Sequence, residues 1–326
     1  MAELPESVHQ SNAIENSTLT LEETEGIIED GITPSRSLDL REVYEAKNLG
    51  LVTADLIDHP RPLSIDLILH WHGLLLQGIR DDAAGRFRRG NEWVRVGGHI
   101  GANPAMVHEL MTETLSRYLT DDDRYFLEKI AWFHCEFEVI HPFVDGNGRI
   151  GRILINQQLQ ARGLPPVIIR ADTRRQDYYP LLVEYARSND ESGMTRLLSL
   201  LLSEALNKRI AILEGRRIVP LDIWAKSMSI PTSDALREAE NQTIPAFRVR
   251  LEWMIDEHHH PGTPPELSNQ DTYPPSAGES TSELAPHPFD VSVDPFYDDV
   301  NMTVIRRRIA DAEAGRNMTE HELIDD

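Results

Sequence analysis

Twelve residues near the middle of the chain have the side chains needed to bind a polyphosphate. They form the run His-Pro-Phe-Val-Asp-Gly-Asn-Gly-Arg-Ile-Gly-Arg, from His141 to Arg152. Its glycines let the backbone turn N–H groups toward an anion, and a helix beginning around Asn147 would add its positive end there. Asp145 provides hard oxygen ligands suited to a magnesium ion that also touches phosphate. The run therefore predicts a polyphosphate site.

Three further side chains of the run could act on the bound anion. Arg149 and Arg152 lie three positions apart, and hence on one face of a helix, from which both guanidinium groups can reach phosphate oxygens. His141 is the nearest side chain able to accept a proton near neutral pH, and it lies at the start of the turn. These positions predict a base beside the bound phosphates.

The run resembles the signature of the Fic family, His-x-Phe-x-Asp/Glu-Gly-Asn-Gly-Arg-x-x-Arg, at every fixed position. Most Fic proteins are protein adenylyltransferases, which move AMP from ATP to a hydroxyl side chain of another protein and release pyrophosphate. By this resemblance His141 is the base, Asp145 holds Mg²⁺, the two arginines hold the outer phosphates, and Phe143 is the buried plug of the loop. The resemblance also places these residues at the nucleotide: Val96, Gly97, Gly146, Asn147, Gly148, Ile150, Gly151 and Tyr178.

Two other interpretations of the run are possible. The segment from Gly146 to Gly151 also fits the dinucleotide fingerprint, with Asp172 as the ribose acid. That fingerprint needs an apolar strand directly before it, whereas apolar residues spaced at three and four from Phe126 to Phe137 indicate a helix. A helix-entry turn with its arginines on a solvated face would explain part of the set but not all of it. For Tyr178, ordinary packing at a helix start is the alternative to contact with the nucleoside.

Residues 1–37 contain a second pattern of the same family. Ser11, Glu15 and Asn16 fit the inhibitory pattern Ser/Thr-x-x-x-Glu-Gly/Asn, and their place before the core resembles the class with an N-terminal inhibitory helix. By this resemblance Glu15 pairs with Arg152 and so occupies the guanidinium that the γ-phosphate needs. An acidic residue on a surface helix is the alternative. We expect residues 1–37 to be an inhibitory segment.

Helical periodicity dominates residues 38–215, the expected catalytic domain. Apolar stripes predict helices near residues 63–75, 106–119 and 194–206, and a capping box at Thr20 and Glu23 predicts a short helix before the domain. Between the first two stripes, the Gly90-Asn91 turn and the run from Trp93 to Val96 predict a small β-hairpin.

Fic proteins have a flap at the place of this hairpin, and the lead-in Gly85-Arg86-Phe87-Arg88 resembles its usual start. The resemblance implies that residues 85–98 dock an extended segment of the target protein by β-augmentation. A connecting hairpin with no such role is the alternative.

Residues 216–257 resemble the small excisionase-like helix-turn-helix domain in their apolar pattern between Val219 and Ile255. The expected recognition helix, residues 232–242, carries three acidic residues against one arginine, whereas DNA-binding helices need cations to hold phosphates. Contacts with proteins are therefore favoured over DNA binding, which stays possible.

Composition restricts the class of protein further. The net charge is −22, of which residues 256–326 carry −12, and this disfavours nonspecific binding to nucleic acid or anionic membranes. Cys135 is the only cysteine, which excludes a disulfide within the chain. There is no basic-then-apolar leader and no long apolar run, so we expect a cytoplasmic protein. Residues 258–326 are expected to be a disordered acidic tail with a possible short terminal helix.

Together these patterns predict a mainly α-helical, Fic-type protein adenylyltransferase that uses ATP and Mg²⁺, modifies a target protein and itself, and is autoinhibited by Glu15. It has a hairpin flap and a helix-turn-helix-like module, and it could form a homo-oligomer. One alternative is a Fic-fold enzyme that transfers a different group, such as phosphate or phosphocholine, or removes AMP. The other is a DNA- or protein-binding regulator with a silent Fic domain.

Overall fold

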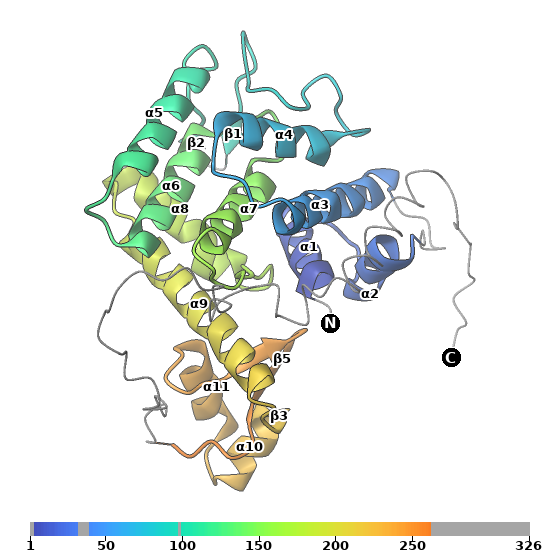
Figure 1. The fold of residues 1–326 in the computed structure, drawn as a ribbon, viewed down its shortest axis with the longest axis vertical. Coiled ribbons are helices and arrows are strands. Elements are labelled where there is room, and N and C mark those ends of the chain that lie inside the picture. Colours follow the sequence, from blue (N-terminus) through green and yellow to red (C-terminus); the bar gives the residue numbers. More distant parts are fainter. Residues whose placement is uncertain (1–2, 32–38, 97–98, 262–326) are drawn as a thin grey trace, which may run out of the picture. The chain divides into compact units, whose positions relative to one another are not determined.

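The computed structural model describes residues 3–31, 39–96 and 99–261 (Figure 1). The chain divides into two compact units, with the boundary between Leu202 and Ser203 inside helix α9, Ser192–Leu213. The first unit is helical apart from one small hairpin, so the predicted mainly α class is confirmed. The tail from residue 262 onward lies outside the described residues.

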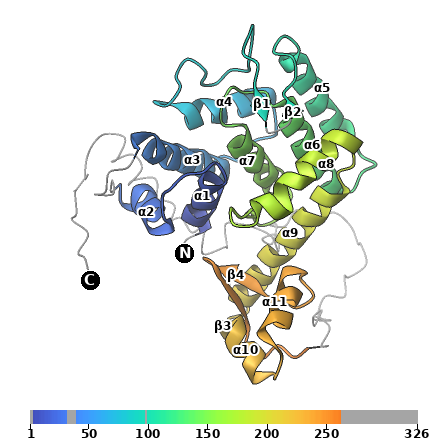
Figure 2. The same ribbon diagram turned by 180° about the vertical axis from the view of Figure 1, so that it is seen from behind.

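The first unit is a set of helices packed around α7, which contacts α1, α3, α4 and α6 (Figure 1). Helix α8 packs on the other side of α6, as the reverse view shows (Figure 2). The helices are α1 (Glu3–Ile14), α2 (Leu21–Glu25), α3 (Leu40–Asp58), α4 (Ile65–Leu76), α5 (Val107–Thr120), α6 (Phe126–Ile140), α7 (Asn147–Gln160) and α8 (Tyr179–Ser188), with π-helical turns at Gly26–Asp30 and Arg174–Tyr178.

Local sequence signals account for the ends of several helices. The predicted capping box starts α2: Thr20 Oγ1 accepts the Glu23 N–H at 3.1 Å, and the Glu23 carboxylate accepts the Thr20 N–H at 2.9 Å. Ser64 caps α4 with a single bond, because its hydroxyl oxygen accepts the Leu67 N–H at 3.1 Å. The three predicted apolar stripes lie on α4, α5 and α9.

The core between α6 and α7 is apolar and closely packed. Phe133 and Phe137 of α6 and Ile150 of α7 have no exposed surface, and Cys135 is equally buried. Burial of each such large side chain stabilises the fold by roughly 1.5–3 kcal/mol. The loop that joins the two helices is therefore anchored at both ends in a closely packed core.

The hairpin differs from the prediction in where it turns. Strand β1, Arg95–Val96, pairs antiparallel with β2, His99–Ile100, so the paired strands both follow Gly90-Asn91 and are not joined by that turn. The earlier turn exists, with Gly90 at φ 59°. It belongs to a loop closed by the Arg86–Glu92 ion pair at 2.7 Å, which keeps that stretch from extending into a strand.

The second unit contains the two helices expected for a helix-turn-helix, α10 (Leu221–Ser227) and α11 (Thr232–Glu240) (Figure 2). It also contains an antiparallel sheet that was not predicted, with strand order β3-β5-β4. The strands are β3 (Ile218–Pro220), β4 (Phe247–Val249) and β5 (Glu252–Asp256). Trp224, Ala235, Ile244 and Ile255 are buried in one small core.

None of the helices in the described part of the chain combines the length and apolar character needed to cross a lipid bilayer.

Candidate active site

The glycine-rich run forms a tight loop between α6 and α7. His141 ends α6 in the left-handed region, at φ 51°, which is a strained conformation for a residue with a side chain. Gly146 precedes α7 at φ 82°, and a Cβ there would lie 2.9 Å from Leu75 Cδ2, so only glycine fits. Because Gly146 has no side chain to cap α7, the first N–H groups of that helix are available to an anion.

Phe143 and Asn147 hold the loop in shape. Phe143 is fully buried and stacks on His72, with ring centroids 3.6 Å apart. The Asn147 amide bonds to the backbone of Phe143 on both sides, accepting its N–H at 2.8 Å and donating to its carbonyl at 2.9 Å. The Asn147 side chain is thus turned toward the loop, and its predicted contact with phosphate stays a prediction.

His72 supports the loop through hydrogen bonds, a role that was not predicted from the sequence. The Gly85 N–H donates to its Nδ1 at 3.1 Å, and its Nε2 lies 3.1 Å from the Asp145 carbonyl. Burial lowers the pKa of His72 to about 4, so the ring is neutral and donates from Nε2. The backbone of Asp145 is fixed by this bond.

Arg88 ties the flap segment to the same loop. Its guanidinium is buried and donates to the carbonyl groups of four residues, at distances between 2.7 and 3.1 Å: Glu92, Ala102, Ile140 and His141. The Arg88 N–H also donates to the Pro142 carbonyl at 2.9 Å. The position of His141 therefore depends on the segment that precedes α5.

The predicted base, His141, is mostly buried, with 16% of its side chain exposed. Its Nδ1 lies 3.3 Å from the Glu138 carbonyl oxygen and 3.7 Å from the Glu138 carboxylate. Burial raises the pKa of Glu138 to about 8. If Nδ1–H donates to that carbonyl, the lone pair that can accept a proton is on Nε2.

Asp145 lies in a four-membered group of charges. Arg149 Nη2 donates to Asp145 Oδ1 at 3.1 Å, and Arg41 Nη2 donates to Oδ2 at 2.6 Å. Glu45 Oε1 accepts a hydrogen bond from Arg41 Nε at 3.0 Å and forms an ion pair with Arg149 Nη1 at 3.1 Å. Burial alone would raise the pKa of Asp145, but the two arginines hold it below its ordinary value. Arg41 and Glu45 were not predicted, and an acid four residues after an arginine indicates by itself only a helix pair.

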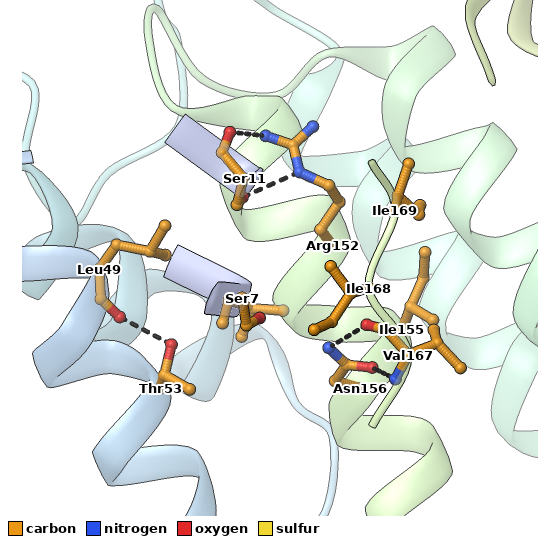
Figure 3. A pocket seen from close by; sticks show the side chains of 11 residues that line it. Ser7, Ser11, Leu49, Thr53, Arg152, Ile155, Asn156, Val167, Ile168 and Ile169 are labelled. Carbon is orange, nitrogen blue, oxygen red and sulfur yellow. Dashed lines mark hydrogen bonds between the residues drawn. The ribbon is translucent and has the colours of Figure 1, made fainter. Parts of the chain in front are cut away.

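Arg152 is held by the N-terminal segment (Figure 3). Its Nε and Nη2 donate to the hydroxyl and the carbonyl of Ser11, both at 2.9 Å, and Nη2 also donates to Glu15 Oε1 at 2.9 Å. The Glu15 carboxylate lies against Gly148, where an added Cβ would collide with Oε1. A carboxylate therefore lies at the N-terminal end of α7, against both Gly148 and the arginine.

Two more contacts anchor α1 to the core. Glu6 and Arg170 form an ion pair at 2.9 Å in which both side chains are at least 95% buried. Gln10 Oε1 accepts the Ala171 N–H at 2.9 Å. Neither contact could be predicted, because the partners are about half the chain apart in sequence.

A small cavity lies between α1, α3 and α7, next to the Ser11–Arg152 contact (Figure 3). Its volume of about 20 Å³ has room for about one water molecule, not a nucleotide. Asn156 lines it and bonds to both backbone groups of Val167, at 2.9 and 3.1 Å. Asn156 therefore positions the chain beyond α7.

Other residues predicted at the nucleotide lie in different surroundings. Tyr178 is buried, with its hydroxyl 2.7 Å from His134 Nε2, and Ile150 is part of the core. Gly151 packs against the same histidine, because an added Cβ would lie 3.0 Å from its Cε1. Val96 lies on β1, and Gly97 is outside the described residues. The nucleotide contacts predicted for these five residues stay predictions.

Helices α6 and α7, joined by this loop and contacted by the N-terminal helix α1, form a Fic-type helical fold. Residues 62–159 match the Fic/DOC family. The structure resembles that of a Fic domain containing signaling protein from Bacteroides thetaiotaomicron, with a TM-score of 0.58 and 25% identity over 66% of this chain and 88% of that one. It resembles a Fic family protein from Desulfovibrio desulfuricans similarly, with a TM-score of 0.56 and 26% identity over 76% and 75%. Residues 62–159 therefore form a Fic/DOC family domain.

Curated relatives share this region. Protein adenylyltransferase Fic of Nematostella vectensis is 36% identical over 180 residues, which are 54% of this chain and 42% of that protein. Protein adenylyltransferase Fic of Drosophila melanogaster is 33% identical over 198 residues, 59% of this chain and 39% of that protein. The chain thus matches about two fifths of the length of these relatives.

Proposed function

We propose that the chain is a protein adenylyltransferase that transfers AMP from ATP to a hydroxyl side chain of a target protein and of itself. The observation that carries the proposal is the N-terminal end of α7, where the Glu15 carboxylate lies against Gly148 and accepts a hydrogen bond from Arg152. Arg149, on the same turn, donates to Asp145, and His141 ends the helix on the other side of the loop. A carboxylate and a phosphate bind guanidinium and backbone N–H groups in the same way. The names of the curated relatives support this activity.

In the proposed reaction the target hydroxyl oxygen attacks the α-phosphorus of ATP. A bond forms between that oxygen and phosphorus, the bond from the α-phosphorus to the bridging oxygen breaks, and pyrophosphate leaves. His141 Nε2 accepts the hydroxyl proton, while the α7 N-terminus and the arginines stabilise the leaving group. Positioning and electrostatics provide most of the acceleration.

Asp145 is the residue proposed to hold Mg²⁺. Magnesium is commonly bound in proteins by one or two carboxylates together with phosphate oxygens, so a single carboxylate at the phosphate end of the site fits. Its pKa, held below the ordinary value, keeps it ionised near neutral pH. The ion would neutralise charge on the phosphates.

We further propose that Glu15 inhibits the enzyme. It engages Arg152 and lies against Gly148, where an outer phosphate of ATP would otherwise bind. The two anions compete for one guanidinium. Displacement of the Glu15 side chain would then let ATP take the orientation needed for attack.

The proposed docking surface for the target is the flap of residues 85–98. Trp93 lies two residues before β1 and is 56% exposed, and Ile100, which pairs with Arg95 at that same end of the hairpin, is 52% exposed. An extended target segment could pair with the edge of this short hairpin. The hydroxyl would then be presented to His141, whose backbone is tied to the flap through Arg88.

The test is an incubation of the protein and a lysate with ATP labelled at either the α- or the γ-phosphate. We expect the α-label to stay on protein, more in Glu15→Gly than in the unmodified chain. Retention of the γ-label would indicate phosphate transfer instead, and no retention of either label would contradict the proposal.

A further inference from the structure

Arg41, in the first turn of α3, reaches Asp145 across 104 residues of sequence. Its Nη2 donates to Asp145 Oδ2 at 2.6 Å, and Arg149 donates to Oδ1 at 3.1 Å. Each carboxylate oxygen of Asp145, the proposed metal ligand, thus accepts a hydrogen bond from an arginine. A divalent ion on this carboxylate would be brought next to a cation.

The two arginines differ in how firmly they are held. Arg149 is 3% exposed and also pairs with Glu45 at 3.1 Å, so its removal from the site would leave buried charges unpaired. Arg41 has 48% of its side chain exposed. Solvent can replace the partners of Arg41 at little cost, because half-exposed ion pairs are weak.

The backbone beside Arg41 is held in place, so only its side chain needs to move. Asp39 caps α3 by accepting the Arg41 N–H at 2.9 Å. Glu42 accepts the Thr18 N–H at 2.8 Å and the Ser17 hydroxyl at 3.1 Å, which joins α3 to the segment that follows Glu15. A rotation of the Arg41 side chain toward solvent is sufficient to uncover Asp145 Oδ2.

Arg41 stays charged throughout. Its hydrogen bond to Glu45 raises the pKa of the guanidinium above its already high value. A guanidinium and a divalent cation repel each other on the same carboxylate oxygen, so occupation by one disfavours the other. Arg41 therefore competes with the metal and does not assist it.

We propose that Arg41 is a displaceable cation that occupies Asp145 when no metal is bound, and that it sets the Mg²⁺ concentration at which this protein binds ATP. Arg41 is a positioning residue: it holds the Asp145 carboxylate in place when no metal is bound, and it is displaced when the ion binds. The inference rests on the proposed function, because it takes Asp145 as the metal ligand of the ATP site.

The test is a calorimetric titration of the full chain with ATP, in EDTA and then at increasing Mg²⁺. All variants carry Glu15→Gly, so that the Glu15 carboxylate does not compete with ATP. We compare the parent with Arg41→Ala and Arg41→Gln. We expect the half-saturating Mg²⁺ concentration to fall about three- to tenfold in both, the size expected for loss of a half-exposed charged hydrogen bond. ATP affinity in EDTA is expected to stay within about twofold.

Two controls separate this effect from a general change in charge. Arg124→Ala removes an arginine of similar exposure that pairs with Asp121 and Glu191, and it should leave the Mg²⁺ midpoint unchanged. Asp145→Asn should abolish the difference between Arg41→Ala and its parent. Circular dichroism checks that each variant is folded.

Two outcomes would overturn the inference. An unchanged Mg²⁺ midpoint in a folded Arg41→Ala or Arg41→Gln protein would show that Arg41 does not compete with the ion. A loss of ATP affinity in EDTA would show that Arg41 binds phosphate itself. Failure of the proposed function is distinguishable, because it would appear as absent α-label transfer despite normal Mg²⁺-dependent ATP binding.

Discussion

The carboxylate of Glu15 lies 2.9 Å from Arg152 Nη2, although 137 residues separate the two in sequence. Glu15 is 39% exposed, whereas Arg152 is 8% exposed and is also held by Ser11. The arginine is thus the fixed partner and the carboxylate the one that can leave. This asymmetry is what an inhibitory side chain requires, because its release need not disturb the phosphate-binding group.

Glu15→Gly should raise self-labelling from α-labelled ATP about ten- to a hundredfold, since a shift of a few kcal/mol changes a mostly inhibited population to a mostly competent one. Arg152→Ala in that background should remove the gain. Ala13→Gly is the matched control, because it loosens the end of α1 without removing a carboxylate. Equal labelling by the unmodified chain and Glu15→Gly, at the same ATP and Mg²⁺, would contradict inhibition by Glu15.

His141→Ala should lower label transfer about 10²- to 10⁴-fold, the usual contribution of a general base. ATP binding should be nearly unchanged, because the imidazole takes the proton and does not hold phosphate. Calorimetry and label transfer on the same preparation measure the two effects separately. Transfer at the unmodified rate would rule out His141 as the base.

Asp145→Asn should weaken both Mg²⁺-dependent ATP binding and transfer, because the carboxylate is the proposed metal ligand. Addition of EDTA to the unmodified protein should have the same effect, and excess Mg²⁺ should reverse it. The variant also loses an ion pair with Arg149, so its melting temperature must be measured alongside. Transfer that continues in excess EDTA is the result that would exclude a metal at this residue.

Glu6→Ala should reduce the free energy of unfolding by about 3–5 kcal/mol, because it leaves Arg170 buried without its carboxylate. The same variant should increase self-labelling, since the pair anchors α1. Lys226→Ala is the control: its pair with Asp222 is exposed, so its loss should change the free energy of unfolding far less than Glu6→Ala does. Denaturant titration measures the free energy of unfolding of both variants. A loss as small as that of the control would show that the buried pair does not hold α1.

The full chain should show no salt-dependent binding of duplex DNA at roughly micromolar protein. Helix α11 contains Asp234, Glu238 and Glu240 with only Arg237 as a cation, and Arg237 already pairs with Asp234 at 3.1 Å. A gel-shift series at low and high salt measures this. A shifted band that disappears steeply with salt would favour the DNA-binding alternative for residues 216–257.

Features that depend on neighbouring residues could be predicted from the sequence. The capping box at Thr20 and Glu23 was predicted because its partners are three positions apart, and the start of α7 at Asn147 because the glycine-rich turn lies directly beside it. The predicted position of the hairpin turn was wrong. Gly90-Asn91 has the composition of a hairpin turn, but the Arg86–Glu92 ion pair closes this stretch into a loop before the strands begin. The sheet of the second unit was missed because β3 pairs with β5, which lies more than 30 residues further along the chain.

The sequence by itself indicated the mainly helical class and the match of residues 62–159 to the Fic/DOC family, because twelve adjacent residues carry the signature of that family. Only the tertiary structure decided what surrounds them. Arg41 on Asp145, Arg88 on the carbonyl of His141 and Glu6 on Arg170 each join segments far apart in the chain. Such contacts leave no local pattern, because an arginine that pairs across the fold has the same sequence neighbours as one that points into water.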